Sequence, residues 1–450
     1  MEHQGGDAVD TIPLLGAPAR VVRDAARAVK RVAGLAIQAV TAGTLTQLLG
    51  LPGLVVTEYA LEKQGEGDVL HLFCQHEHEV AVCSRCGVLS VVEHESEERC
   101  VRHLDIWGKR TFVHFSARRF ECAHCRKPFT EELVWIEGKR RQTHAFELHI
   151  YQRCQTTDQA SVAEAERLHP TTVKDIFYRL AKRAERRHPR DRVRRLGIDE
   201  ISLKKGHQQF ALVLSDLQRH RVMAVLPERS QKALEQWLDG LSAEERAEIR
   251  VVAMDMWGPY RGVVRSRLAH AKIVADRFHV MKQLNDRIAQ IRRAVQAKAD
   301  PATRDILKGT YWILIKNRAD LTPDEEVKLQ AALSVSAELR TAYLLKEEFH
   351  TLCEKLHDRS RAERFLRAWA WRAEASGIPQ LHKFVQTLHN WWNEFLNYFD
   401  ERVTSGVVEG LNRAIRAIIR RACGYHVFEH FRLQVLVEHG GLGKPSPPLI

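Results

Sequence analysis

The sequence predicts a multidomain protein that combines an α/β domain with α-helical domains. Three observations lead to this prediction. Two Cys-x-x-Cys pairs lie in a strand-like region, strand-like and helical segments alternate over residues 191–282, and the pattern over residues 283–400 is helical throughout. A chain of 450 residues has the length of about three domains.

The composition points to a partner with many negative charges. The chain has 69 Lys and Arg residues against 57 Asp and Glu, a net charge of +12. With 44% hydrophobic and 28% charged residues, it is neither collagen-like nor wholly disordered. No run approaches the ~18 apolar residues of a membrane span, and basic residues interrupt the N-terminal segment, unlike a signal peptide. We therefore expect a cytosolic protein with reduced cysteines.

Residues 1–45 form an N-terminal extension. Apolar residues from Val22 to Ala36 recur at helical spacing, with arginines between them. This pattern predicts either a basic amphipathic helix that contacts DNA or a poorly ordered extension.

A zinc-ribbon domain is predicted for residues 46–135. Two residues between thiolates allow one turn to direct both sulfurs at one ion, and four thiolates complete a tetrahedral Zn²⁺ site. Residues 111–122 alternate like a strand and connect the two pairs. The alternative is two pairs of buried thiols, and Cys74, His76 and His78 are rival ligands that we do not favour. The predicted ligands are Cys83, Cys86, Cys122 and Cys125.

A helix-turn-helix and a basic linker are predicted for residues 141–190. Helices are expected over 149–155, 159–168 and 173–183, the last capped by Thr171 or Thr172. A helix of this kind lies in the major groove, and a structural helical linker is the alternative. The third helix would present Thr171, Thr172, Lys174, Asp175 and Tyr178. Nine Lys and Arg residues between Arg179 and Arg195 indicate phosphate contacts, among them Arg183, Arg186 and Arg187.

Residues 191–282 predict a mixed sheet flanked by helices. Strand-like segments cover 196–205, 209–216, 221–228, 249–256 and 272–280, with a helix from Ser230 to Leu241 and another from Tyr260. This is the strand and helix order of the ribonuclease-H-like fold. Asp199 lies midway along the first strand and Asp255 ends the fourth.

These two aspartates predict a metal site. In that fold the first and fourth strands are neighbours, and adjacent carboxylates repel unless a divalent cation lies between them. Oxygen ligands suit Mg²⁺ or Mn²⁺, and two such ions promote an in-line phosphoryl displacement. Taken alone, each aspartate is better explained as a strand-end cap or turn residue.

A third acid is predicted in residues 401–440, the last part of this core. Thr404 or Ser405 would cap a helix, with Glu409 about one turn in. Basic residues follow on much the same face, which suits a site that cuts a nucleic-acid strand; the alternative is a solvated acid. These residues are Arg413, Arg416 and Arg420.

An all-α insertion over residues 283–400 separates the second and third acids. Its apolar stripe, which includes Trp391 and Trp392, is expected to form a helical core. Either tryptophan is also a weaker candidate for stacking on an unpaired base.

The complete set of motifs resembles the transposases of the ISL-three family of bacterial insertion sequences over residues 46–440. It comprises the four cysteines, GIDE around Asp199, MDMWGPY around Asp255, ADRFHV around Asp276 and SGVVEGLNRAIRAIIRRACGY around Glu409. The resemblance implies a metal-binding triad of Asp199, Asp255 and Glu409, with Asp276 and His279 as accessory residues. The extension of residues 1–45 departs from the family pattern.

The predicted function is therefore that of a metal-dependent DNA transposase. We expect Mg²⁺ or Mn²⁺ and Zn²⁺ as cofactors and double-stranded DNA, both element ends and target, as partner. We also expect a homodimer in the active complex, no membrane contact, and a bacterial cytoplasmic, nucleoid-associated location. The alternatives are a non-catalytic DNA-binding regulator, such as an inactivated transposase, and a structure-specific nuclease of the same fold.

Overall fold

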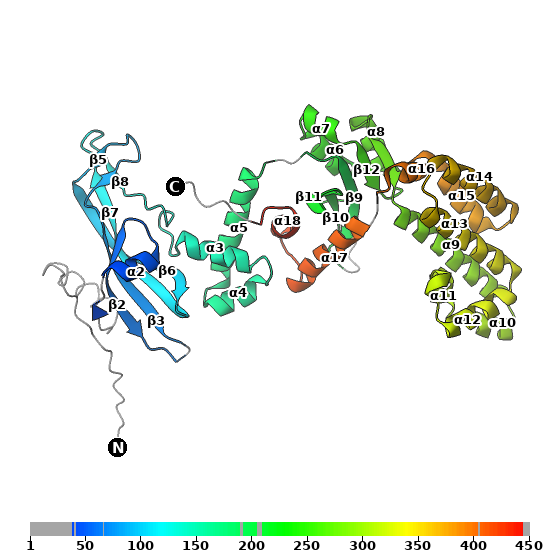
Figure 1. Cartoon of the computed structure of the whole chain (residues 1–450), viewed down its shortest axis with the longest axis horizontal. Coiled ribbons are helices and arrows are strands. Elements are labelled where there is room, and N and C mark those ends of the chain that lie inside the picture. The colour runs from blue at the N-terminus through cyan, green and yellow to red at the C-terminus, as the bar shows by residue number, and fades with distance from the viewer. Residues whose placement is uncertain are drawn as a thin grey trace, which may run out of the picture. The chain divides into compact units, whose positions relative to one another are not determined.

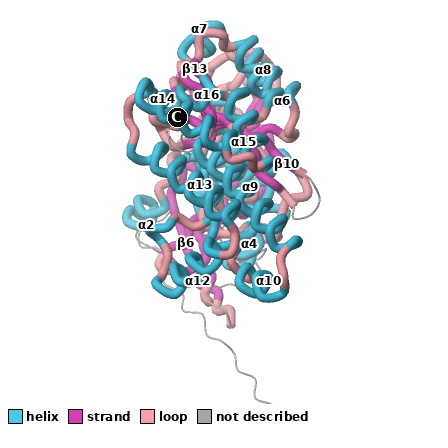
Figure 2. The backbone as a smooth tube through the Cα atoms, turned by 90° about the vertical axis from the view of Figure 1, so that its right-hand side faces the viewer, coloured by secondary structure: helices cyan, strands magenta, loops and turns pink. Residues whose placement is uncertain are grey.

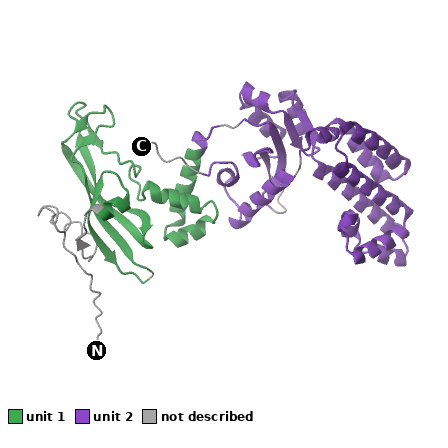
Figure 3. Cartoon of the chain, viewed as in Figure 1, with its two compact units in different colours: residues 1–184, 444–450 green, residues 185–443 purple. Residues whose placement is uncertain are grey.

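The computed structural model describes residues 38–39, 42–65, 67–189, 192–204, 209–403 and 406–443. The chain divides into two units, Met1–Ala184 with Lys444–Ile450, and Glu185–Gly443 (Figure 3). The predicted helix near residues 22–36 and the predicted caps Thr404 and Ser405 lie outside the described residues. Within the described part of the chain, no helix is long and apolar enough to cross a bilayer.

The first unit is built around a six-stranded sheet in the order β1-β2-β3-β7-β6, with β8 also pairing with β7. A separate two-stranded sheet joins β4 and β5. Leu72, Val113 and Phe115 lie in the core of the larger sheet. The elements are β1 (Gln38–Ala39), α2 (Ala42–Leu49), β2 (Leu54–Glu62), β3 (Val69–His76), β4 (Ala81–Val82), β5 (Leu89–Ser90), β6 (Glu93–Ile106), β7 (Lys109–Glu121) and β8 (Pro128–Thr130).

Three helices complete the first unit: α3 (His144–Arg153), α4 (Gln159–Glu166) and α5 (Pro170–Arg187), the last of which ends beyond the unit boundary (Figure 1). Thr143 and Asp158 cap α3 and α4 by accepting hydrogen bonds from backbone N–H groups. Arg167, in the left-handed conformation, ends α4 and turns the chain toward α5. Two short helices, a tight turn and a longer helix are the arrangement that the sequence predicts.

The second unit contains a five-stranded sheet in the order β11-β10-β9-β12-β13. Strands β9, β10 and β11 pair antiparallel, whereas β12 lies parallel to both β9 and β13. The predicted adjacency of the first and fourth strands is therefore confirmed. The strands are β9 (Arg195–Ser202), β10 (Phe210–Asp216), β11 (Arg221–Leu226), β12 (Val251–Met254) and β13 (Lys272–Ala275).

Helices cover both faces of this sheet. On one face, Ile198, Val252 and Met254 pack with residues of α6 (Gln231–Asp239) and α8 (Gly258–Arg267). On the other face, Val251, Ala253 and neighbouring residues pack with the helices that follow β13. A short helix not predicted from the sequence, α7 (Ala243–Glu248), precedes β12.

All regular elements between residues 277 and 401 are helical, and helices α9, α13 and α15 pack side by side (Figure 2). The apolar stripe that contains Phe384, Leu388 and Phe395 forms their core. The helices are α9 (Arg277–Lys298), α10 (Pro301–Leu307), α11 (Tyr311–Ile315), α12 (Pro323–Ser334), α13 (Ala337–Lys355), α14 (Arg359–Ala375), α15 (Pro379–Asn390) and α16 (Trp392–Glu401), with a 3-10 turn at Arg318–Asp320. Helices α17 (Gly406–Arg421) and α18 (Phe428–His439) follow.

Candidate metal centres and nucleic-acid surfaces

The four predicted cysteine ligands converge in the first unit. One sulfur from each of Cys83, Cys86, Cys122 and Cys125 lies within 4.8 Å of the other three. All four are free thiols, and the Cys86 and Cys122 sulfurs are 3.5 Å apart. Phe120 and Phe129 pack beneath the cluster. Four thiols gathered in this way are a suitable ligand set for a tetrahedral zinc ion.

A tight turn holds each cysteine pair. The backbone N–H groups of Gly87 and Arg126 donate to the carbonyls of Cys83 and Cys122, both over 2.8 Å. Both donors have positive φ angles, 74° and 50°. The backbone N–H of Cys125 donates to the Cys122 sulfur and, as the largest influence, lowers the pKa of that thiol to about 6. The hydrogen bond with Cys86 raises the pKa of Cys125, so within this cluster it is Cys122 that is favoured as the thiolate, the form that binds metal.

The third helix of the helix-turn-helix begins earlier than the sequence suggests. Helix α5 starts at Pro170, so the prediction that Thr171 or Thr172 is the N-cap is wrong. His169 acts as the cap, because its Nδ1 accepts a hydrogen bond from Thr171 N over 3.3 Å. Proline is favoured at the first position of a helix, where its missing N–H costs nothing.

Only part of the predicted DNA-reading face of α5 is accessible. Lys174 is exposed and Thr172 is half-buried, whereas Tyr178 is only 8% exposed, so its predicted place on that face is wrong. Asp175 forms an ion pair with Arg140 at 2.5 Å.

The basic residues of α5 divide into two groups. Arg179 pairs with Glu147 at 2.6 Å and with Glu137 at 3.2 Å, and it therefore holds helices of its own unit together. Arg183 lies 3.8 Å from Glu137 and is half-buried, whereas Arg186 and Arg187 are exposed. The exposed pair is the more accessible to phosphates.

Three aspartates lie in one row across the parallel strands of the second unit. Met254 of β12 is paired with Ile198 of β9 and with Ala275 of β13. One residue further along each chain segment are Asp199, Asp255 and Asp276. The predicted strand over 272–280 is too long, since β13 ends at Ala275 and Asp276 caps α9 by accepting from Phe278 N over 2.9 Å.

Gly197 allows β9 to lie close to its neighbours two residues before Asp199. A Cβ atom at this position would lie 2.5 Å from Ser215 Oγ and 2.7 Å from Leu217 Cδ2. Such distances are well inside van der Waals contact, so only glycine fits without movement. The backbone that carries Asp199 is thereby fixed against β10.

Helix α17 contacts this row through Asn412. Its Nδ2 donates to Asp199 Oδ2 over 2.6 Å. The residue is 4% exposed, and its Oδ1 is buried without a hydrogen-bond partner among the described residues. An unsatisfied buried amide oxygen is costly, and this one has the capacity to accept a further hydrogen bond or to coordinate a cation.

Glu409 lies on the same helix, three residues before Asn412, and faces solvent. Its side chain is 56% exposed and pairs with Arg413 at 3.1 Å. Among the described residues, the four cysteines are the only group of three or more ligand side chains gathered closely enough to hold one metal ion. The carboxylates of Asp199, Asp255 and Glu409 are therefore not gathered in this way. Arg413, Arg416 and Arg420 are all exposed along α17.

Burial is the main influence on the electrostatics of the row. Burial raises the pKa of Asp255, opposed by His279 and reinforced by Asp199. The predicted accessory residue His279 lies beside the row, with its Nε2 3.9 Å from Asp199 Oδ1 and 3.9 Å from Asp276 Oδ2. A cation among these carboxylates would relieve the repulsion.

A second acid in β9 was not expected from the sequence. Glu200 accepts a hydrogen bond from Tyr260 Oη over 3.2 Å and pairs with Arg229 at 2.7 Å. Burial raises its pKa. Strand alternation turns Glu200 toward the α8 face while Asp199 faces α17, and two consecutive acids in an otherwise apolar strand were the available signal.

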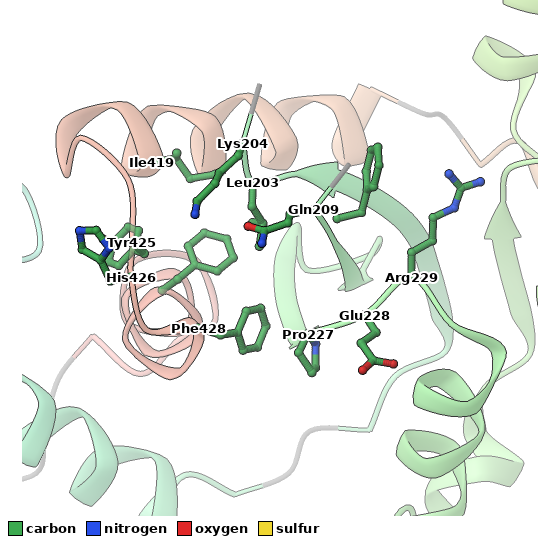
Figure 4. Close-up of a pocket in the computed structure, with 12 residues that line it drawn as sticks. Leu203, Lys204, Gln209, Pro227, Glu228, Arg229, Ile419, Tyr425, His426 and Phe428 are labelled. Atoms are coloured by element: carbon green, nitrogen blue, oxygen red, sulfur yellow. The ribbon is translucent and has the colours of Figure 1, made fainter. Parts of the chain in front are cut away.

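A cavity of about 680 Å³ adjoins this site (Figure 4). Phe210, Tyr425 and Phe428 contribute aromatic walls, and Lys204 lies among the lining residues. Arg229 lines the same cavity and also contacts Glu200. The cavity is therefore linked to Glu200 through Arg229, and its described lining includes none of the three aspartates.

The two tryptophans considered for base stacking are covered by other side chains. Trp391 is 5% exposed, and the Arg261 guanidinium lies 4.2 Å from the centre of its ring. His389 stacks on Trp392 with ring centres 5.3 Å apart. The suggestion that Trp391 stacks on a base is therefore wrong, since its ring belongs to the helical core.

Comparisons with known families match three consecutive regions. A family described as transposase matches residues 196–435, more than half of the chain. The zinc-finger of transposase IS204/IS1001/IS1096/IS1165 matches residues 79–125, and the helix-turn-helix domain of transposase family ISL3 matches residues 131–181. These regions contain the cysteine cluster, helices α3 and α4 with most of α5, and the row of aspartates.

Two curated relatives match along most of their length. The transposase for insertion sequence element IS1001 of Bordetella parapertussis is 29% identical over 374 residues, which cover 82% of this chain and 91% of the relative. The transposase for insertion sequence element IS1557 of Mycobacterium tuberculosis is 27% identical over 401 residues, covering 82% of this chain and 89% of the relative. With its zinc ribbon, its helix-turn-helix and a transposase domain that spans more than half of its length, this chain belongs to the ISL3 family of transposases.

Proposed function

We propose that this transposase hydrolyses a phosphodiester bond at each end of an insertion element and joins the freed 3′-OH to target DNA. The observation that carries the proposal is the in-register placement of Asp199 and Asp255 on adjacent parallel strands. The order β11-β10-β9-β12-β13, with helices on both faces, supports a ribonuclease-H-like core. A pair of carboxylates at neighbouring positions on its central strands, Asp199 within β9 and Asp255 directly after β12, is suited to metal-assisted cleavage.

The residues present fit a divalent cation. Asp199 and Asp255 supply hard oxygen ligands of the kind that Mg²⁺ and Mn²⁺ prefer. Glu409, which faces solvent and pairs with Arg413 in this structure, would join them as the third ligand only after its side chain turned toward the aspartates. The unsatisfied Oδ1 of Asn412 and the burial of Asp255 both favour a positive charge at this point. When bound, the ions activate the attacking oxygen and stabilise the leaving oxygen.

The chain's own residues position and complement these groups. Asn412 donates to Asp199 and fixes the orientation of its carboxylate. His279 lies beside Asp199 and Asp276 as an accessory residue. We propose that Arg413, Arg416 and Arg420 contact the phosphates of the strand being cut.

The first unit would recognise the element ends. Thr172 and Lys174 near the start of α5 would reach the major groove, and Arg183 would contact the DNA backbone. Arg186 and Arg187, at the end of the same helix and in the second unit, would also contact the backbone. The four-cysteine cluster would bind one Zn²⁺ and stabilise the ribbon. Because two ends must be held together, we propose a homodimer in the active complex, acting in the bacterial cytoplasm.

The test uses duplexes that carry the terminal inverted repeats flanking the coding region. Asp199→Asn and Asp255→Asn should each reduce Mg²⁺-dependent cleavage at least about 1,000-fold while leaving the Kd for the duplex unchanged. Asp286→Asn, an exposed aspartate on α9, is the matched control and should cleave normally. Undiminished cleavage by both site variants would refute the proposal. Binding by the parent chain without cleavage would indicate the non-catalytic regulator instead.

The zinc proposal has its own test. Cys122→Ala should lower the zinc content from about one ion per chain to none, as measured by atomic emission. Cys423→Ser changes an exposed cysteine outside the cluster and should retain the ion. Retention of zinc by Cys122→Ala would exclude the four-cysteine site.

A further inference from the structure

The end of the sheet opposite to the aspartates carries a row of cations. Arg195 and Lys272 are both paired with Val251, so they flank β12 at the amino ends of the three parallel strands. Arg194 and Arg250 precede this row and are joined by a backbone hydrogen bond of 2.9 Å from Arg250 N to Arg194 O. The strand pairing that aligns three carboxylates at one end therefore gathers four cations at the other.

These cations surround a cavity of about 550 Å³. Glu401 contributes the cavity's single carboxylate and pairs with Lys272 at 3.1 Å and with Arg195 at 3.6 Å. Gln218 and His270 complete its polar lining. The cavity is therefore lined mainly by hydrogen-bond donors, as a binding site for an anion would be.

The charges of this cavity do not balance. Arg194 pairs with Glu248 at 3.1 Å outside the lining, so four cations face two carboxylates. Arg250 and His270 are exposed, and neither forms an ion pair with any described residue. If these cations served only to hold α16 against the sheet through Glu401, the exposed Arg250, which has no ion-pair partner among the described residues, would not be needed. The excess of positive charge is available to a ligand.

We propose that this basic cavity binds the phosphate backbone of duplex DNA, and that it holds a different stretch of DNA from the one at the aspartates. Four residue steps separate Val251 from Asp255 along the chain, which is about 13 Å at ~3.3 Å per residue. One phosphate cannot reach both ends over that distance. Guanidinium groups match phosphate oxygens well, and DNA is the regularly spaced polyphosphate that a transposase handles. That the DNA at the aspartates is the DNA being cut rests on the proposed function.

The test is a salt titration of DNA binding by the full chain. Kd for a fluorescent 40-base-pair duplex of random sequence is measured by anisotropy at several salt concentrations, without added divalent cation. The triple variant Arg194→Gln, Arg250→Gln, Lys272→Gln should bind more weakly, and the slope of log K against log salt should become less steep by about 2.7, at ~0.9 for each lost phosphate contact.

A matched control removes the same net charge elsewhere. Lys298, Lys308 and Lys328 are exposed residues in or beside helices α9, α10 and α12. The triple Lys→Gln variant at these positions should keep the parent slope. It separates direct phosphate contact from the general effect of lowering the charge of the whole protein.

Two outcomes would overturn the inference: an unchanged slope in the cavity variant, or an equal change in the control. If the triple variant does not fold, the single variant Arg250→Gln replaces it, because Arg250 pairs with no described carboxylate; its slope should fall by about 0.9. The assay involves no cleavage. A failure of the proposed catalytic chemistry would therefore leave its result unaffected, and the two failures can be told apart.

Discussion

Replacing Asn412 by alanine tests whether the α17 contact with Asp199 serves the reaction. Asn412 Nδ2 donates to Asp199 Oδ2 over 2.6 Å, and the residue is 4% exposed. A hydrogen bond to a charged group contributes about 1.5–3 kcal/mol. If that energy helps to orient Asp199 in the transition state, the cleavage rate should fall roughly 10- to 100-fold, since ~1.4 kcal/mol corresponds to a factor of ten.

The assay compares single-turnover cleavage of an inverted-repeat duplex at a series of Mg²⁺ concentrations. A mispositioned Asp199 should also raise the Mg²⁺ concentration that gives half the maximal rate, which a purely structural loss would not do. Gly410→Ala is the control on the same helix, because a Cβ at Gly410 would meet no atom within 4 Å. It should cleave at the parent rate. Parent-like cleavage by Asn412→Ala, with an unchanged Mg²⁺ requirement, would refute the reasoning.

Two further predictions concern stability. Gly197→Ala should lower the free energy of unfolding by about 1–3 kcal/mol in urea denaturation, because its Cβ would overlap Ser215 and Leu217; Gly262→Ala, in open space on α8, should instead raise it by about 0.5–1 kcal/mol. Burial raises the pKa of Glu58 to about 7, so the folded chain keeps this proton above the ordinary pKa of the group and loses stability as the pH rises from about 4.5 to 7. Glu58→Gln should therefore stabilise the protein at pH 8 and have little effect at pH 4.5, and equal melting-temperature shifts at the two pH values would contradict this.

The parts of the site that the sequence predicts well depend on regular local patterns. Cysteine spacing indicates which four thiols meet, because each pair lies within one turn. The adjacency of Asp199 and Asp255 is predicted because the order of strands and helices matches the ribonuclease-H-like fold, in which the first and fourth strands are neighbours. The first prediction depends on the spacing of a few residues, and the second depends on the order of strands and helices along the chain.

The parts that the sequence predicts poorly depend on how elements pack. Glu409 and Asn412 lie three residues apart, about one turn, on α17. Only the way in which the helix packs decides which of the two is buried against Asp199. The cap of α5 is hard to predict because His169, and not a threonine, accepts the hydrogen bond from the backbone N–H at the start of the helix. The strand prediction ran past Ala275 because the apolar residues Phe278 and Val280 suit either a strand or the start of α9.

The central sheet is unbalanced in charge at both ends, in opposite senses. Three aspartates lie near His279, one midway along β9 and the others directly after β12 and β13, while Arg229 is already paired with Glu200. At the amino ends, four cations face two carboxylates. None of these charged side chains belongs to the hydrophobic layers on the two faces of the sheet. A ligand of opposite charge at each end would reduce this imbalance, and the two proposals assign divalent cations to the aspartates and a DNA backbone to the basic cavity.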